Sequence, residues 1–427
     1  MTHSTIWHPF TQHALLPDSI LIDRTEGVYL YAKDGRRIID AISSWWVNIH
    51  GHNHPKIVAS VQEQASKLDQ IIFAGFTHEP AEKLAEKLMK LTPPNLTRVF
   101  YSDSGSTAVE VALKMALGYW AYKDKKRRGV VAFDQAYHGD TFGAMSLSYR
   151  GVFTAPYENF LFDVHRLPFP ETGQEHLTVE ALKKLLKKKA EIIAALIVEP
   201  LVLGAAGMRI YSASTLCALH DLCKRYGVIF IADEVMTGWG RTGTIFACDQ
   251  AHVNPDILCL SKGLTNGYLP MGATLATEEI YQAFYSTDRA KTFFHSTSFT
   301  GNPLACAAAC ASLDLWEENN VLERIKLLHD QQAALRPRLE LRKDIKNVRH
   351  IGTIMALDVC EIRQGYLSDV ALKLYRYFLA KGVLLRPIGQ TIYLLPPYCI
   401  SQEDLKFVIG TIELALDELA CGNLDHF

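Results

Sequence analysis

One lysine in this sequence stands where a reactive amine would be expected. Lys262 closely follows the apolar run Ile257–Leu260, and its neighbours Ser261 and Gly263 are both small. Partial removal from water lowers the pKa of a lysine, and the neutral amine can then attack an aldehyde. A lysine in this position is more often a surface residue, so the assignment depends on what the neighbouring segments supply.

Acidic and aromatic residues follow three other apolar runs. Asp233 directly follows Val228–Ala232, where a carboxylate without a cationic partner would be costly. A protonated pyridine nitrogen would be such a partner, and the pairing keeps the ring an electron sink. Glu199 ends a second run, and Tyr137 follows a third and could stack on a planar ring. Taken singly, Asp233 would be a turn residue and Tyr137 a core residue.

A loop of small residues predicts an anion site. Gly105 and Ser106 open a helix-like segment after the apolar run Arg98–Tyr101. Free backbone N–H groups and the dipole at a helix start favour a phosphate there. A phosphate, a ring nitrogen and an aldehyde are the features of pyridoxal phosphate. The lysine, acid, aromatic residue and anion loop together therefore indicate that cofactor.

These residues can meet only if the strands before them share one sheet edge. The apolar runs lack period-two alternation, which is typical of strands buried on both faces, and helix-length segments separate them. Such alternation predicts an α/β fold with a largely parallel sheet, whose ligands bind beyond the carboxyl ends of the strands. The expected strands are Arg98–Tyr101, Val130–Phe133, Ile192–Val198, Val228–Ala232, Ile257–Leu260 and Ala273–Ala276, and the expected helices include Ser106–Tyr122, Thr178–Lys189 and Ala213–Tyr226.

The length of 427 residues is enough for two domains. Residues 21–40 predict a small meander with a turn at Asp34-Gly35, and the last hundred or so residues contain a long helix-like stretch, two strand candidates and a closing helix. We therefore predict a large domain at 43–317 that carries the central sheet. A small α+β domain would be built from both termini, residues 1–42 and 318–427.

The composition excludes some functions and favours one compartment. A net charge of −2 gives no reason to expect nucleic acid or a membrane surface as a partner. No apolar run approaches the ~20 residues that span a bilayer. The nine cysteines contain no Cys-x-x-Cys pair, which favours reduced thiols in a cytoplasmic protein over a disulfide framework.

Two further motifs are better explained as turns. Gly238–Gly243 matches G-x-G-x-x-G, but Asp233 and Glu234 stand between the strand and the glycines, where they would repel a pyrophosphate. The alternating histidines of His50–His54 could share a metal, but the intervening Gly51 and Asn53 favour a turn, so we predict no metal site.

The ordered motifs resemble those of class III aminotransferases over nearly the whole chain. They are Asp103–Glu110, Tyr137–Gly139, Asp233–Val235, Gly240–Gly243, Ser261–Gly263 and Phe299–Ala305. The resemblance implies a fold type I pyridoxal-phosphate-dependent transferase, with a mostly parallel sheet in its large domain. It also implies a homodimer whose active sites lie at the subunit interface.

Within this family, three further segments resemble members that aminate 8-amino-7-oxononanoate in biotin biosynthesis. They are Trp7–Phe10, Ser43–Trp46, and Arg386-Pro387 together with Tyr393–Tyr398. The amino donor of these members is usually S-adenosylmethionine. Phe10 stands where the family commonly has tyrosine, so lysine is kept as an alternative donor. Another class III omega-aminotransferase, a mutase of the same fold and a non-catalytic cofactor-binding protein are the remaining alternatives.

The resemblance also implies a role for each site residue. Lys262 would bind the cofactor and act as general base, Asp233 would pair with the ring nitrogen, and Tyr137 would contact ring and substrate. Gly105 and Ser106 would hold the phosphate, with Thr297 and Ser298 of the neighbouring subunit. The implied substrate contacts are Phe10, Trp45, Trp46, Tyr137, Lys262, Ser296 and Arg386, with Asp140 and Arg241 as further candidates at the donor site.

Overall fold

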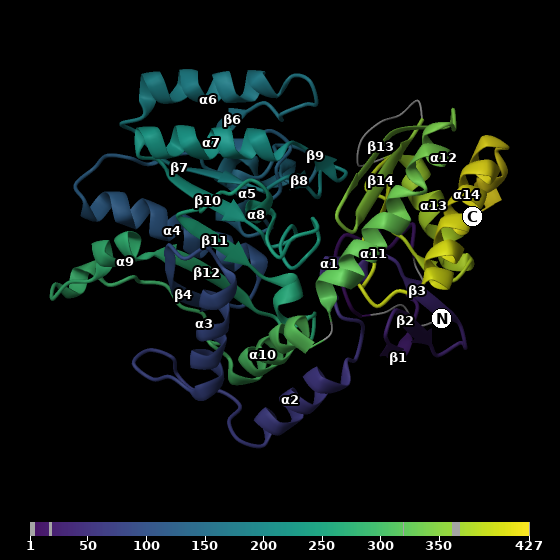
Figure 1. Cartoon of the computed structure of the whole chain (residues 1–427), viewed down its shortest axis with the longest axis horizontal. Coiled ribbons are helices and arrows are strands. Elements are labelled where there is room, and N and C mark those ends of the chain that lie inside the picture. Colours follow the sequence, from purple (N-terminus) through teal and green to yellow (C-terminus); the bar gives the residue numbers. More distant parts are fainter. Residues whose placement is uncertain (1–4, 17–18, 319, 361–367, 427) are drawn as a thin grey trace.

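The protein has two lobes, which Figure 1 shows side by side. The computed structural model describes residues 5–16, 19–318, 320–360 and 368–426. Residues 1–4, 17–18, 319, 361–367 and 427, which belong to the predicted small domain, lie outside the described residues. The larger lobe contains the central sheet, and the smaller lobe contains strands and helices from both ends of the chain.

The central sheet of the larger lobe has seven strands in the order β4-β12-β11-β10-β7-β5-β6. β12 is antiparallel to both of its neighbours, whereas the other pairs of adjacent strands are parallel. The expected mostly parallel α/β sheet is therefore confirmed. The strands are β4 (Leu96–Ser102), β5 (Gly129–Phe133), β6 (His165–Leu167), β7 (Ile193–Val198), β10 (Ile229–Asp233), β11 (Ile257–Leu260) and β12 (Gly272–Thr277).

Alternate residues of these strands face two different cores. Ile229 and Ile231 of β10 join the core under α4 (Gly105–Tyr122), while Phe230 and Ala232 join the core on the other face. Because both faces are covered, every residue of β10 is buried, which explains the missing alternation in the sequence. The second core is covered by α3 (Glu79–Leu91), α6 (Glu175–Lys189), α7 (Ala213–Tyr226) and α10 (Pro303–Glu318).

Local capping explains where the predicted helices begin and end. The Ser212 side chain accepts a hydrogen bond from the Thr215 N–H and begins α7, and Gly227 ends it with a left-handed φ of 60°. The α7 boundaries match the sequence prediction, and α4 starts one residue earlier than predicted, at Gly105. The start of α4 matters because it lies at the carboxyl end of β4.

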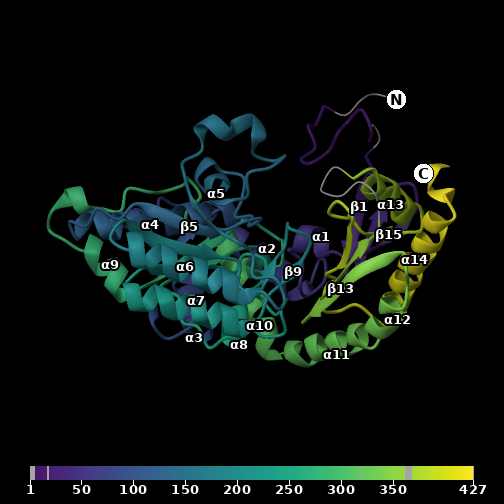
Figure 2. The same ribbon diagram turned by 90° about the horizontal axis from the view of Figure 1, so that it is seen from above.

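The smaller lobe pairs the beginning of the chain with its end. β1 (Ile22–Glu26), β2 (Tyr29–Ala32) and β3 (Arg37–Asp40) form the expected antiparallel meander, and β15 (Val383–Leu384) adds to β3 in parallel. β1 and α14 therefore lie in the same lobe in both views (Figures 1 and 2). The lobe also contains the sheet β13 (Ile345–Ile351), β14 (Ile354–Val359) and β16 (Thr391–Leu394), and the helices α11 (Val321–Ala333), α12 (Arg336–Glu340), α13 (Asp369–Ala380) and α14 (Gln402–Ala420).

Most of the remaining elements are short. They are α1 (Ser43–Trp46), α2 (Pro55–Ala65), α5 (Phe142–Leu147), α8 (Ala247–Gln250), α9 (Glu278–Phe284), the hairpin β8 (Val202–Leu203) and β9 (Arg209–Ile210), and the 3-10 turns η1 (Ala155–Phe160), η2 (Lys262–Thr265), η3 (Arg289–Lys291) and η4 (Asn423–His426). The domain boundaries at residues 43 and 317 stay a prediction.

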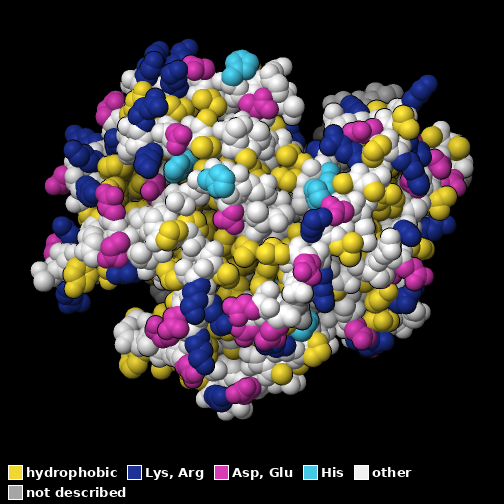
Figure 3. All heavy atoms as spheres, in the orientation of Figure 1, with side chains coloured by type: hydrophobic (Ala, Val, Ile, Leu, Met, Phe, Trp, Pro, Cys, Tyr) yellow, Lys and Arg dark blue, Asp and Glu magenta, His cyan; other side chains and the backbone are white. Residues whose placement is uncertain are grey.

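The surface mixes both charge signs. In the view of Figure 3, Lys and Arg side chains gather over α6, whose last turn contains three lysines, while acidic side chains are scattered among basic ones elsewhere. Among the described residues, no helix is both long and apolar enough to cross a membrane.

Candidate functional site

A cavity of about 250 Å³ lies at the carboxyl edge of the central sheet. It brings together nine of the residues that were given a role from the sequence, and they come from both lobes. Those residues are Phe10, Trp45, Trp46, Gly105, Ser106, Tyr137, Asp233, Lys262 and Arg386. The cavity is also lined by Ser104, His138, Gly139, Phe153, Glu199, Ala205, Val235, Met236, Pro387, Ile388 and Tyr393.

The start of α4 forms a cradle of small residues on one wall of the cavity. Ser104 caps the helix by accepting from the Thr107 N–H at 3.1 Å. A Cβ at Gly105 would lie 2.6 Å from Cγ1 of Val235, and one at Gly139 would lie 2.1 Å from Oγ of Ser106. Both positions therefore need glycine. The first turn contains no acidic residue, so its N–H groups and dipole fit a phosphate group.

Asp233 ends β10 and is held in place from two sides. Nδ1 of His138 lies 2.7 Å from Oδ2 of Asp233, and the Val235 N–H donates to Oδ1 at 3.2 Å. The other ring nitrogen of His138 is buried without a hydrogen-bond partner. These contacts fix the carboxylate and leave it on the cavity wall, where it fits a protonated ring nitrogen. Sequence reasoning missed this role of His138, although its position beside Tyr137 in a strand-end loop was a signal.

Lys262 begins the turn after β11 with a left-handed φ of 46°. Its Nζ lies 5.1 Å from the centre of the Trp46 ring. Burial lowers the pKa of Lys262, while the negative charges of Asp233 and Glu199 act in the opposite direction and raise it. Because burial is the larger effect, the neutral amine is favoured more than in an exposed lysine.

Glu199 is a buried acid whose role sequence reasoning did not assign. It follows β7, and its two oxygens accept from the N–H groups of Tyr137 at 2.9 Å and Gly204 at 3.0 Å. Burial raises the pKa of Glu199 to about 7. Burial and the nearby Asp140 carboxylate also raise the pKa of the Tyr137 hydroxyl, so Tyr137 is neutral near pH 7. The hydrogen bonds that Glu199 accepts from Tyr137 and Gly204 fix the loop that carries Tyr137.

The mouth of the cavity is aromatic and carries one arginine. The Phe10 ring lies 5.5 Å from the Trp45 ring and 5.6 Å from the Phe153 ring. The guanidinium of Arg386 lies over Trp45 at 5.2 Å, and it donates to the backbone carbonyl of Phe10. A half-buried guanidinium stacked on an aromatic ring keeps further N–H donors for a carboxylate.

The two tryptophans stand on an unusual backbone. Ser43, Ser44, Trp45 and Trp46 have φ values of 53°, 44°, 69° and 73°, so all four lie in the left-handed region without a glycine. The turn is closed by hydrogen bonds from the Trp46 N–H to the Ile42 carbonyl and from the Val47 N–H to the Ser43 carbonyl, both at 2.9 Å. Each such residue costs about 1–2 kcal/mol, so the turn is a strained element beside the cavity.

Some of the named residues do not line this cavity. Ser296, Thr297 and Ser298 lie in the segment between η3 and α10, where Ser296 and Ser298 are exposed. Asp140 is exposed and outside the lining as well. Arg241 is buried and donates to the backbone carbonyls of Trp46, Asn48 and Pro396 at 3.0–3.2 Å. It holds the chain around the tryptophans instead of facing the cavity.

The two motifs interpreted as turns have separate structural roles. His50 is buried, His52 contacts Asp40 at 2.8 Å, and the His54 side chain caps α2. Among the described residues, no group of three or more His, Cys, Asp or Glu side chains could hold a metal ion. The glycines of 238–243 lie in the turns between β10 and the four-residue helix α8.

Comparison with known proteins identifies the family. Residues 11–416 match the profile of the family described as aminotransferase class III. The adenosylmethionine-8-amino-7-oxononanoate aminotransferase of Synechococcus elongatus is 48% identical over 98% of this chain and 100% of its own. The enzyme with the same name from Helicobacter pylori is 40% identical over 98% of this chain and 97% of its own. The chain belongs to the class III aminotransferases.

Solved structures agree with this assignment. The adenosylmethionine-8-amino-7-oxononanoate aminotransferase of Methanocaldococcus jannaschii superposes with a TM-score of 0.93, at 35% identity over 97% of each chain. An amine transaminase from an uncultivated Pseudomonas species, in its PLP-bound form, superposes with a TM-score of 0.91 at 32% identity, over 98% of this chain and 99% of that one. The expected fold type I transferase architecture is confirmed.

The charge balance around Lys262 gives a first test. Asp233→Asn removes the charge that raises the pKa of Lys262 the most, so that pKa should fall further below its ordinary value. The measurement is the pH midpoint at which an amine-reactive reagent labels Lys262 in cofactor-free protein, followed by mass spectrometry. Asp221→Asn on α7 is the control and should leave the midpoint where it is. A midpoint that rises in Asp233→Asn contradicts the assigned charge balance.

Proposed function

We propose that this protein transfers an amino group to 8-amino-7-oxononanoate and forms 7,8-diaminononanoate, with pyridoxal phosphate as cofactor, as a step of biotin biosynthesis. S-adenosylmethionine is the proposed amino donor, and lysine is the alternative. The observation that carries the proposal is the cavity itself, which has Lys262 and Asp233 on its inner wall and Trp45 and Arg386 at its mouth. The names of the similar enzymes support the choice of acceptor.

The inner wall fits the cofactor. Gly105 and Ser106 would hold the phosphate, because a larger side chain would fill the cradle. The fixed carboxylate of Asp233 would hold the proton on the ring nitrogen. When bound, pyridoxal phosphate supplies an aldehyde carbon and an electron-withdrawing ring that stabilises negative charge at the carbon bearing the amino group.

Lys262 would move the proton that the amino transfer requires. Burial lowers its pKa, so its Nζ is available as a base once it is not engaged covalently. The Trp46 ring, whose centre is 5.1 Å from Nζ, limits where that amine can swing. Tyr137 would line the substrate site from the loop after β5, with its backbone fixed by Glu199.

The mouth of the cavity fits the proposed acceptor. That substrate has a ketone and an amine at one end, an apolar chain, and a carboxylate at the other end. Trp45 and Trp46 supply an apolar wall, and the guanidinium of Arg386 can bind a carboxylate with two parallel N–H bonds. Phe10, which packs on Trp45, would close the outer end of this slot.

A homodimer would complete the phosphate site. In this proposal Thr297 and Ser298 reach the phosphate of the neighbouring subunit, and Ser296 contacts its substrate. The segment that carries them exposes Phe294 by 70% and Phe299 by 61%, and neighbouring exposed aromatic rings are typical of protein interfaces. The cytoplasmic location stays a prediction from the sequence.

Loss of the lysine amine gives the sharpest test of the chemistry. Lys262→Ala should abolish turnover and the visible absorption of covalently bound cofactor, because no other lysine lines the described cavity. The measurements are the absorption spectrum and the amination rate of purified protein. Lys291→Ala, in η3 and outside the cavity lining, is the control. An active Lys262→Ala variant with normal absorption would contradict the assignment of Lys262 as the cofactor-binding lysine.

Loss of the guanidinium should weaken acceptor binding. Arg386→Ala is expected to raise the KM of the keto acid about ten- to a hundredfold, the loss that corresponds to a hydrogen-bonded charge pair. The kcat should change much less, because Arg386 lies at the mouth and not beside Lys262. Arg376→Ala is a matched control, since Arg376 also donates to a backbone carbonyl, that of Leu15, but does not line the cavity. An unchanged KM in Arg386→Ala would argue against binding of the substrate carboxylate by Arg386.

A donor screen tests the proposed function as a whole. Purified protein is incubated with 8-amino-7-oxononanoate and either S-adenosylmethionine or lysine, and 7,8-diaminononanoate is measured. S-adenosylmethionine should support the reaction. If lysine supports the reaction and S-adenosylmethionine does not, lysine is the donor. If neither donor gives 7,8-diaminononanoate, the assignment of the acceptor is overturned. Amination of general amines and ketones instead would indicate a broader omega-aminotransferase.

A further inference from the structure

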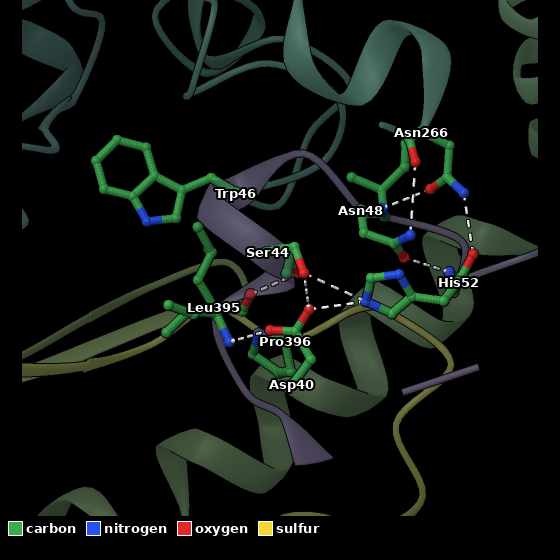
Figure 4. A network of polar contacts seen from close by, with 12 residues as sticks. Asp40, Ser44, Trp46, Asn48, His52, Asn266, Leu395 and Pro396 are labelled. Carbon is green, nitrogen blue, oxygen red and sulfur yellow. Dashed lines mark hydrogen bonds and ion pairs between the residues drawn. The ribbon is translucent and has the colours of Figure 1, made fainter. Parts of the chain in front are cut away.

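Three polar side chains meet behind the left-handed turn that carries the two tryptophans. Oδ2 of Asp40 lies 2.7 Å from Oγ of Ser44 and 2.8 Å from Nε2 of His52, and its Oδ1 accepts from the Ile42 N–H at 3.2 Å. Asp40 is fully buried. Figure 4 shows the cluster on one side of the turn and the Trp46 ring pointing away from it on the other.

The cluster has no part in bond-making chemistry. Its Ser, His and Asp side chains are those of a nucleophilic triad, but a triad needs one histidine nitrogen for the acid and the other for the hydroxyl. Here Nε2 of His52 faces both Asp40 and Ser44, and the Ser44 hydroxyl donates to Asp40. The Ser44 hydroxyl is therefore held by Asp40 and is not activated as a nucleophile.

The hydrogen bond from Ser44 to Asp40, called the tie below, acts on a strained backbone that would otherwise relax. Ser44 and Trp45 adopt φ/ψ values of 44°/61° and 69°/39°, which residues other than Gly and Asn rarely adopt. His52 is itself anchored, because its N–H and carbonyl form a two-way bridge with Gly27 at 2.7 and 3.0 Å. If the turn relaxed, the buried Asp40 carboxylate would lose the Ser44 donor. The cluster and the turn therefore hold each other in place.

The turn fixes where the two indole rings stand. Trp46 lies beside Nζ of Lys262, and its indole N–H donates to the Tyr393 hydroxyl at 3.0 Å. Trp45, the preceding residue, lies under the guanidinium of Arg386. One strained turn thus fixes the distance between the end of the cavity at Lys262 and the end at Arg386.

We propose that Asp40, Ser44 and His52 are positioning residues that select the acceptor by holding this left-handed turn. The cluster fixes the spacing between the apolar wall at Lys262 and the stacked guanidinium of Arg386, and so favours a keto acid of matching chain length. The inference rests on the proposed function for its substrate, and it adds residues outside the cavity lining to the set that determines binding.

Three substitutions of Ser44 separate positioning from strain. Ser44→Ala removes the tie and keeps the strained backbone. Ser44→Gly removes the tie and relieves the strain, because glycine adopts positive φ without cost. Ser44→Asn tolerates the left-handed conformation and keeps a donor for Asp40. Ser60→Ala is the matched control, since Ser60 also loses one hydroxyl hydrogen bond, to the Ala307 carbonyl, away from the cavity.

The readouts are steady-state kinetics of the holoenzyme and amide hydrogen exchange at Trp46 and Val47. Ser44→Ala and Ser44→Gly should both raise the KM of the keto acid about tenfold, with less than about a twofold change in kcat, as expected for one charged hydrogen bond. Both should speed exchange of the two amides, and Ser44→Asn should restore both values. If Ser44→Ala fails to fold, Ser44→Gly carries the test.

Two results would overturn the inference. One is an unchanged KM and unchanged exchange in Ser44→Gly, which would make the cluster irrelevant to the turn. The other is a Ser44→Gly variant that binds the keto acid like the wild type while Ser44→Ala does not, which would reduce the role of Ser44 to strain. A wild-type protein that does not aminate the keto acid overturns the proposed function instead, and amide exchange still reports on the turn.

Discussion

The structure depends on bringing ionisable groups out of water at one edge of a sheet. Lys262, Asp233 and Glu199 all line the same small cavity, where an unpaired charge is costly. Burial raises the pKa of Glu199 to about 7 and lowers the pKa of Lys262. Both shifts favour the neutral form of the group concerned. The third group, Asp233, faces the position proposed for a protonated ring nitrogen.

Parallel strands make this arrangement possible, because each strand end delivers a different group to the same place. β10 delivers Asp233, β11 precedes Lys262, and β7 precedes Glu199. The loops after the strands then fix one another, since Glu199 holds the backbone of Tyr137 and His138 holds Asp233. Removing one such contact would therefore disturb a second strand end as well.

The sequence predicted six of the seven central strands, because burial on both faces leaves a readable apolar run, and it missed the three-residue edge strand β6. It could not predict that β12 runs antiparallel, since its run Ala273–Ala276 looks like the others. It also could not separate Arg241, which binds backbone carbonyls, from Arg386, which faces the cavity. Contacts between distant segments decide both questions, and no local pattern records them.

The left-handed turn is the clearest case of structure that local sequence hides. Ser43–Trp46 contains no glycine or asparagine, and its strain of about 4–8 kcal/mol in total follows from the ordinary cost per residue. The hydrogen bond from the Ser44 hydroxyl to Asp40, at about 1.5–3 kcal/mol for a charged acceptor, offsets part of this strain. The buried acid that ends β3 thus helps to hold the turn. Residues of the small lobe thereby shape a cavity whose reactive groups belong to the large lobe.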